Sequence, residues 1–203
     1  SRPVVVACDV AGRGTDKTVV VRREGGRSRI VHEESYTDDL TVLTDWLDAY
    51  LKVERAERVV VDSVGIGFGL AGNLRRLGIR NIEEFVGGAR AREGDRFVDR
   101  NAEVWWRMRE AFLASETDIE NNPELMRQLT SRQYTIQGDK RIRLQPKGEL
   151  AHSPDEADAL AMTFVVLNGS SSSDHHPIVA KRPSSSGIGT PRHRSVIVVG
   201  GRH

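Results

Sequence analysis

The N-terminal part of the chain alternates short apolar runs with turn residues. Each run is rich in Val and Ile, as is typical of β-strands. The connections between the first three runs are short and contain glycine, which predicts two consecutive antiparallel hairpins. We therefore expect five strands in this part of the chain, over residues 4–9, 18–23, 29–35, 59–62 and 82–86.

Apolar residues at the helical period predict helices between and after these strands. A helix over residues 38–52 is expected to begin at a cap provided by Thr37 or Asp38. A second helix over 65–77 is expected to end at Gly78. This order of elements predicts a mixed α/β sheet flanked by helices. The later elements are expected to be helices over residues 101–113, 123–131 and 153–167, and a hairpin over 133–144 that turns at Gly138-Asp139.

The composition changes near the end of the chain. After Gly169 the sequence is rich in Ser, Pro, Gly and His, with no periodic apolar pattern before residues 196–199. We expect one compact domain over residues 1–169 and a flexible basic tail over 170–203, because 203 residues suit a single domain. No apolar run approaches the ~20 residues of a membrane span, and no signal-peptide pattern is present, so a cytosolic protein is expected.

Charge and cysteine content restrict the possible functions only a little. The formal net charge is +1, but bases outnumber acids in the predicted tail, which leaves the rest of the chain mildly acidic. A nucleic-acid enzyme of this composition needs local basic loops rather than an overall positive field. Cys8 is the only cysteine and is expected to be a buried strand residue, while His175-His176 in the tail is a weak metal motif.

Three aspartates stand where strands end or a helix begins. Asp9 and Asp62 each close an apolar strand, and Asp158 lies inside the last predicted helix beside residues that must face the core. If they converge to ~4 Å, each pair of like charges costs on the order of 4 kcal/mol at an effective dielectric of 20. Either they lie apart or cations lie between them. Oxygen ligands without His or Cys favour Mg²⁺ or Mn²⁺, and two such ions can clamp a scissile phosphate.

The last predicted helix carries a second aspartate. Ser153 is expected to cap it, with Pro154 at the first helical position and Glu156 completing a capping box. Asp155 then lies in the first turn, where it either stabilises the helix dipole or joins the metal site. Asp155 and Asp158 are three residues apart and therefore share one face of the helix.

Two nucleotide-binding motifs are only approximated. Residues 12–18 end like a phosphate-binding P-loop, but Asp16 replaces the glycine before Lys17, and Thr18 begins a strand instead of a helix. Residues 65–69 follow a strand, yet their glycines fall at every second position, which does not match the dinucleotide fingerprint.

Taken together, four segments resemble the nuclease domain of tailed-phage large terminases. The similarity covers roughly residues 4–166 and runs through residues 9–18, 62–67, 101–106 and 153–160. The resemblance implies a ribonuclease H-like fold, a mixed five-stranded sheet whose first three strands are antiparallel. It further implies a metal-dependent endonuclease that cuts double-stranded, concatemeric viral DNA during genome packaging. Such an enzyme would have low sequence specificity and use two Mg²⁺ or Mn²⁺ ions.

The resemblance also assigns roles to single residues. Asp9 would bridge both metals, Asp62 would bind one, and Asp158, with Asp155, would complete the site. Asp16 would support the ligands from outside the metal's reach, or is simply a turn carboxylate. Lys147 either contacts a phosphate or is a solvated lysine.

The loop before residue 101 is rich in arginine. Its basic residues would track the DNA backbone without reading sequence, although neighbouring acids partly cancel them. Trp105 and Trp106 are expected to anchor the core, since they belong to a helical apolar pattern. The candidate DNA contacts are Arg90, Arg92, Arg96 and Arg100.

The resemblance places the chain within a larger machine. Complete large terminases carry an upstream ATPase motor with a true P-loop, so this chain is expected to be an isolated C-terminal nuclease piece. Its partners would be double-stranded DNA, the motor domain, the small terminase subunit and the portal, in the host cytoplasm. Two alternatives stay open: a noncatalytic module that docks on the portal or the motor, and an ATP-phosphate-binding domain of the sugar-kinase and actin type.

Overall fold

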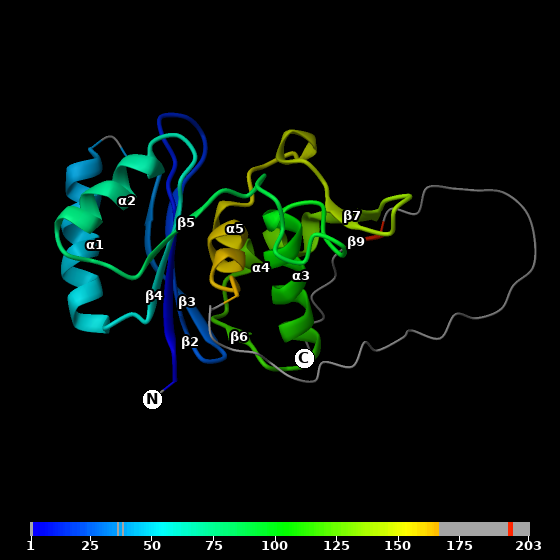
Figure 1. Ribbon diagram of the computed structural model, residues 1–203, viewed down its shortest axis with the longest axis horizontal. Helices are drawn as coiled ribbons and strands as arrows, with labels where there is room; N and C mark the ends of the chain where they lie inside the picture. The colour runs from blue at the N-terminus through cyan, green and yellow to red at the C-terminus, as the bar shows by residue number, and fades with distance from the viewer. Residues whose placement is uncertain (1, 36, 38, 167–194, 197–203) are drawn as a thin grey trace, which may run out of the picture.

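A mixed six-stranded sheet forms the centre of the molecule, in the order β5-β4-β1-β2-β3-β6 (Figure 1). The computed structural model describes residues 2–35, 37, 39–166 and 195–196. β1 is antiparallel to β2 and parallel to β4, while β3 is antiparallel to β2. The strands are β1 (Val4–Asp9), β2 (Thr18–Glu24), β3 (Arg27–Glu34), β4 (Arg58–Asp62), β5 (Ile82–Phe85) and β6 (Asp118–Ile119).

Helices cover both faces of this sheet, and this explains its uniformly apolar strands. α1 (Leu40–Glu54) and α2 (Gly67–Arg76) lie on one face, and α5 (Asp155–Met162) lies on the other, beneath α3 (Arg100–Leu113) and α4 (Pro123–Ser131) (Figure 1). Alternate residues of β1 enter the two cores: Val6 and Cys8 pack with α1 and α2, whereas Val5 and Ala7 pack with α3 and α5.

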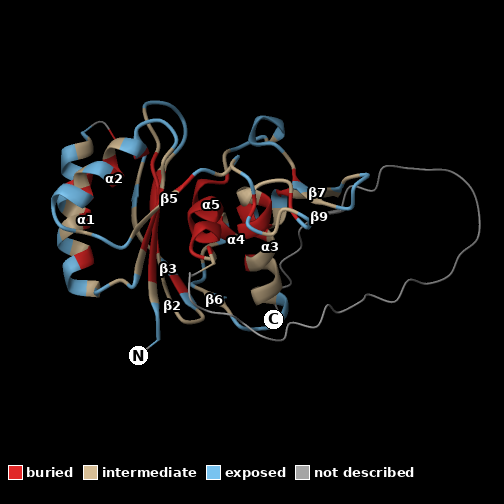
Figure 2. Ribbon diagram, viewed as in Figure 1, coloured by how far each residue is buried: buried red, intermediate tan, exposed pale blue. Residues whose placement is uncertain are grey.

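Every residue of α5 is buried, as Figure 2 shows in red. Ala157, Ala159 and Ala161 have small side chains, which allow the helix to approach the sheet closely. Its acidic residues are buried with it, and a buried carboxylate is costly unless it is paired or hydrogen-bonded. The partners of these acids therefore define the chemistry of this region.

A second, small sheet lies beyond α3, in the order β8-β7-β9 (Figure 1). The predicted hairpin is confirmed as β7 (Gln133–Ile136) and β8 (Ile142–Leu144), followed by the 3₁₀ turn η1 (Lys147–Glu149). β9 (Ser195–Val196) pairs with β7. The remainder of the predicted tail, including His175-His176, lies outside the described residues, so the domain boundary at residue 169 stays a prediction.

The predicted fold class and the antiparallel first three strands are confirmed, with local corrections. The sheet gains a sixth strand, β6, which is too short to show a strand period in sequence. Asp39, not Thr37, caps α1 by accepting from the Thr41 amide at 2.8 Å, because Thr37 is buried against Thr18. Asp38 lies outside the described residues.

The capping box predicted for the last helix is also wrong. α5 begins at Asp155 and has no side-chain cap, because the Ser153 hydroxyl bonds to the Asp155 carboxylate. The helix ends at Met162, earlier than expected. The Thr163 carbonyl instead accepts from Arg23 Nη2 at 2.6 Å. No helix in the described part of the chain is long and apolar enough to cross a membrane.

Candidate active site

Asp9 and Asp62 lie at the same edge of the central sheet. Asp9 is the last residue of β1, Asp62 is the last of β4, and these parallel strands are neighbours. Asp9 is buried, whereas Asp62 is half-buried. The Val64 amide donates to Asp62 Oδ1 at 3.1 Å, which orients this carboxylate over the turn that follows β4.

A glycine allows α2 to begin directly beside Asp62. A Cβ atom at Gly67 would lie 1.8 Å from the Asp62 carbonyl oxygen, a distance that no side chain can occupy. The turn after β4 therefore depends on the missing side chain of Gly67, and so does the position of Asp62.

Asp158 approaches from α5 and is held by three side chains. Trp105 Nε1 donates to its Oδ1 at 2.8 Å, and Arg132 Nη1 donates to the same oxygen at 2.6 Å. Lys147 Nζ lies 2.7 Å from Oδ2, as an ion pair and not as an aligned hydrogen bond. This buried carboxylate thus has a fully occupied oxygen and a second oxygen that faces only an ammonium group.

The three carboxylates act on one another electrostatically. Burial raises the pKa of Asp9 well above its ordinary value, and the charges of Asp158 and Asp62 raise it further. Burial also raises the pKa of Asp62, to which the charge of Asp158 adds. Burial alone would raise the pKa of Asp158, but Arg132 and Lys147 outweigh it and hold that pKa below its ordinary value. Asp158 is therefore the acid most strongly held in its ionised form.

Lys147 supplies positive charge to this group of acids. Desolvation lowers the pKa of its ammonium, but the charges of Asp158 and Asp9 raise that pKa above its ordinary value. The side chain is 43% exposed, so it stands at the boundary between the carboxylates and solvent. This position differs from that of a lysine pointing freely into water.

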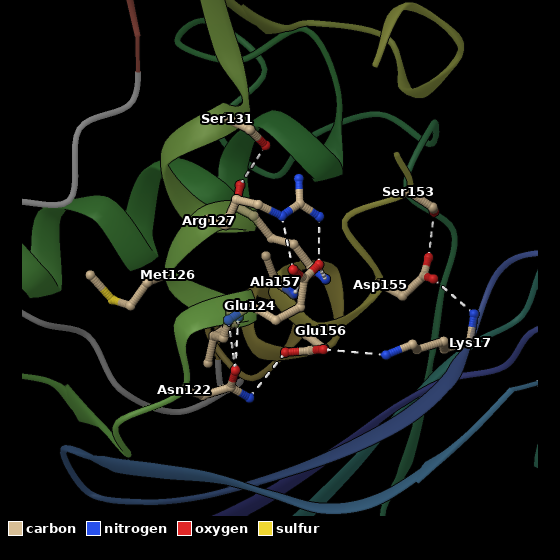
Figure 3. Close-up of polar contacts among 12 residues, drawn as sticks. Lys17, Asn122, Glu124, Met126, Arg127, Ser131, Ser153, Asp155, Glu156 and Ala157 are labelled. Carbon is tan, nitrogen blue, oxygen red and sulfur yellow. Dashed lines mark hydrogen bonds and ion pairs between the residues drawn. The ribbon is translucent and has the colours of Figure 1, made fainter. Parts of the chain in front are cut away.

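Asp155 is oriented toward the turn before β2, as Figure 3 shows. Its Oδ2 accepts from the Lys17 amide at 2.8 Å, and its Oδ1 binds the Ser153 hydroxyl. Burial raises the pKa of Asp155, and the charge of Asp16 contributes to this increase. Asp16 itself is exposed. Because both oxygens of Asp155 are occupied, the geometry favours Asp158 over Asp155 as a metal ligand.

Glu156 is a buried acid that the sequence reasoning did not consider beyond the capping box. It lies between Asn122 and Lys17 (Figure 3): Asn122 Nδ2 donates to Oε2 at 3.1 Å, and Lys17 Nζ lies 3.7 Å from Oε1. Lys17 also pairs with Glu33 at 2.5 Å. These contacts connect α5 to β3 and to the start of α4, and they give Glu156 a structural explanation.

Three of the four arginines expected to contact DNA make ion pairs within the protein. Arg96 pairs with Glu93 and Glu110, at 2.7 and 3.3 Å, and Arg100 pairs with Glu83. Arg92 Nη1 donates to the Val166 carbonyl at 2.7 Å. Arg90 is exposed. DNA contact by these four residues stays a prediction.

Arg132 and the indole N–H of Trp105 are the site features that sequence reasoning missed. Arg132 follows the predicted helix 123–131 directly and belongs to no motif, so nothing in the sequence marks it. Trp105 is fully buried, as expected of a core anchor. Its contact with Asp158, however, depends on the packing of α3 against α5, which the sequence pattern does not specify.

Donor chemistry at this site suits a hard divalent cation. As the described side chains stand, no three His, Cys, Asp or Glu residues are arranged to enclose a metal ion. The available donors are nevertheless carboxylate oxygens, the type that Mg²⁺ and Mn²⁺ prefer. One of them, Asp158 Oδ2, is buried, and among the described side chains it has no aligned hydrogen bond, only the ion pair with Lys147. Asp9, Asp62 and Asp158 therefore fit such a cation in donor type and charge.

Comparisons with known proteins identify the fold. No family model and no curated protein matched the chain. Among solved structures, the nuclease domain of the large terminase subunit gp2 of bacterial virus Sf6 is similar with a TM-score of 0.68 and 21% identity, over 81% of this chain and 89% of that chain. A mutant of that domain, solved with manganese and β-thujaplicinol, gives a TM-score of 0.67 at the same identity and coverage.

A terminase nuclease from another phage gives a similar result. The large terminase nuclease of thermophilic phage G20c, solved with bound magnesium, gives a TM-score of 0.59 at 15% identity, over 81% of each chain. These likenesses span most of every chain compared. The chain has the ribonuclease H-like fold found in large-terminase nuclease domains.

Proposed function

We propose that this chain is a divalent-metal-dependent endonuclease that cuts double-stranded, concatemeric viral DNA during genome packaging, with low sequence specificity. The observation that carries the proposal is that Asp9 and Asp62 end neighbouring parallel strands and that the charge of Asp158, on α5, acts on both. The fold it shares with terminase nucleases, of which some were solved with manganese or magnesium, supports the same activity.

In this proposal the three aspartates divide the work of holding the cations. Asp9, Asp62 and Asp158 would together hold two Mg²⁺ or Mn²⁺ ions, with Asp9 shared between them, Asp62 serving one of them and Asp158 completing the ligand set. When bound, two such ions activate a water and stabilise the leaving oxygen of a phosphodiester. Asp155 supports the site by holding the turn before β2 against α5. Asp16, which is exposed, would act only from outside the metal's reach.

Lys147 reduces the repulsion between an acidic site and an anionic substrate. Its ammonium offsets carboxylate charge at Asp158 and Asp9, and its side chain extends to solvent. A DNA phosphate that approaches these carboxylates would meet this positive charge first. We assign Lys147 the role of drawing the scissile phosphate toward the aspartates.

The wider partners follow from the same proposal. An upstream ATPase motor, the small terminase subunit and the portal would bring DNA to the site, in the host cytoplasm. Because Arg96 and Arg100 are already paired with glutamates, the isolated chain is expected to bind DNA weakly.

A plasmid-nicking assay tests the activity. Supercoiled plasmid incubated with the wild-type chain and Mn²⁺ or Mg²⁺ should become nicked and linear, and a chelator should stop the reaction. Asp62→Ala should reduce cutting to background, whereas Asp45→Ala should not, because Asp45 is exposed on α1, across the sheet. If neither metal supports cutting by the wild type, the docking module becomes the better interpretation.

A further inference from the structure

Asp158 is bound asymmetrically, and the asymmetry comes from two buried side chains. Both hydrogen bonds to the carboxylate, from Trp105 and from Arg132, go to Oδ1. Trp105 is fully buried and Arg132 is 2% exposed. Among the described side chains, Oδ2 has no aligned hydrogen bond, and the Lys147 ammonium pairs with it at 2.7 Å. One oxygen is therefore fixed by two buried donors, and the other faces the exposed side chain of Lys147.

Arg132 is itself held rigidly. It is the first residue after α4, and its backbone is extended there. Its Nε donates to the Gln145 carbonyl at 3.3 Å, and its guanidinium stacks on the Trp105 ring, 4.9 Å from the ring centre. The guanidinium and the indole thus form one unit, which we call the Asp158 clamp, made of Trp105 and Arg132.

The clamp is expected to add little to the stability of the core. A buried ion pair loses much of its attraction to the cost of desolvation, and apolar residues of similar volume often do as well or better. Outer partners that fix a ligand's orientation, in contrast, are a regular feature of metal sites, where their loss weakens metal binding about 10-fold to 100-fold. The burial of Arg132 beside Asp158 is therefore better explained by a need to orient Asp158 than by a gain in stability alone.

We propose that Trp105 and Arg132 are positioning residues that hold Asp158 Oδ1, so that the divalent cation takes Oδ2 alone. This inference rests on the proposed function, because it requires that the aspartates bind metal. It adds two residues to the site, and it specifies that Asp158 binds the metal through a single oxygen. Neither residue touches the cation.

The adjacent tryptophans give a matched pair of variants. Trp105→Phe keeps the aromatic ring but removes the N–H that donates to Asp158. Trp106→Phe removes an equivalent N–H that donates to Glu110 at 2.8 Å, away from the three aspartates. Mn²⁺ binding, followed by calorimetry on the folded protein, should weaken about 10-fold in Trp105→Phe and stay at the wild-type value in Trp106→Phe.

The arginines give a second matched pair. Arg132→Met removes the charge and both donors, whereas Arg132→Lys restores the charge and one donor and should recover part of the Mn²⁺ affinity. Arg23→Met is the control, because Arg23 also bonds to a carbonyl and stacks on an aromatic ring, Phe164, with no contact to Asp158. A role limited to stability predicts a lower melting temperature in both Met variants with Mn²⁺ affinity unchanged in each.

A Mn²⁺-soaked crystal of the wild-type chain tests the geometry without any variant. Anomalous density on Oδ2 alone, with Oδ1 still bonded to Trp105 and Arg132, is the expected result. An ion bound to both oxygens, or wild-type affinity in a folded Trp105→Phe, overturns the clamp and leaves the proposed nuclease intact. A wild-type chain that binds no Mn²⁺ overturns the clamp and the metal-dependent nuclease together.

Discussion

At the residue scale, Asp9 combines a carboxylate with burial at the end of the central strand. It is 8% exposed, and its pKa is raised first by burial and then by the charges of Asp158 and Asp62. The ionised form of Asp9 is thus disfavoured in the folded protein when no divalent cation is bound. Active sites commonly contain ionisable groups whose burial shifts their pKa and lowers the stability of the fold.

Asp9→Asn should therefore be more stable than the wild type at neutral pH in the presence of a chelator. An acid whose pKa is raised on folding binds more protons folded than unfolded, so wild-type stability falls as pH rises from 3.8 through the folded-state pKa. Asparagine has no proton to lose, so the advantage of the variant should grow as pH rises from about 4 to about 8. Thermal melts across this range in EDTA measure it, with Asp45→Asn as the exposed control.

An Asp9→Asn variant that melts at or below the wild-type temperature over the whole range would contradict this expectation. It would mean that the ammonium of Lys147 compensates the ionised carboxylate fully, although burial has the larger effect on the pKa of Asp9.

The two aspartates of α5 should separate into different roles. Asp155→Asn exchanges one carboxylate oxygen for an NH₂ group, which only donates, so the side chain can no longer accept from both Lys17 and Ser153. It is expected to lower the free energy of unfolding by about 1–2 kcal/mol and to leave Mn²⁺ affinity nearly unchanged. Asp158→Asn should instead weaken Mn²⁺ binding by at least about 10-fold. Urea unfolding and calorimetry measure the two effects, and loss of Mn²⁺ binding in Asp155→Asn would return that residue to the ligand set.

At the scale of elements, the site depends on the close packing of the start of α2 against the end of β4. Gly67→Ala would place a Cβ atom 1.8 Å from the Asp62 carbonyl, which is backbone and cannot rotate away. We expect a loss of about 2–3 kcal/mol of stability, together with weaker Mn²⁺ binding because Asp62 is displaced. Denaturant melts and metal titrations of the variant measure both effects.

Gly72 provides the control on the same helix. Nothing lies within 4 Å of a Cβ built there, so Gly72→Ala should stabilise α2 by up to about 1 kcal/mol and leave metal binding unchanged. Equal behaviour of the two alanine variants would show that the end of β4 adapts easily and that Gly67 does not fix Asp62.

The elements of this fold differ in how far their sequence determines them. β1 and β4 are uniformly apolar because helices cover both sheet faces, so their ends, and with them Asp9 and Asp62, are visible in the sequence. The start of α5 was mispredicted because the Ser153 hydroxyl bonds to a side chain in place of the helix backbone. Arg132 was missed because its proposed role comes from tertiary contacts with α5, α3 and the segment after β8.

At the scale of the whole molecule, the proposed function makes Arg96, in the loop before α3, and Arg100, the first residue of α3, candidate contacts with DNA. They differ in their availability: the side chain of Arg96 is 47% exposed, while that of Arg100 is 15% exposed and stacks on Phe85. Arg96 can exchange its glutamate partners for a phosphate at little cost. Arg100 cannot leave Glu83 without exposing a half-buried carboxylate and an aromatic face.

These two arginines should therefore respond differently in a DNA-binding experiment. Arg96→Gln is expected to weaken binding equally for unrelated duplexes and to reduce the slope of log affinity against log salt by about 0.9, the contribution of one phosphate contact. Arg100→Gln should leave the slope unchanged and lower the melting temperature. Fluorescence anisotropy in a chelator, which prevents cutting, measures both slopes. An unchanged slope in Arg96→Gln would mean that Arg96 keeps its pairs with Glu93 and Glu110 in the complex, and DNA would then have to approach the aspartates along another surface.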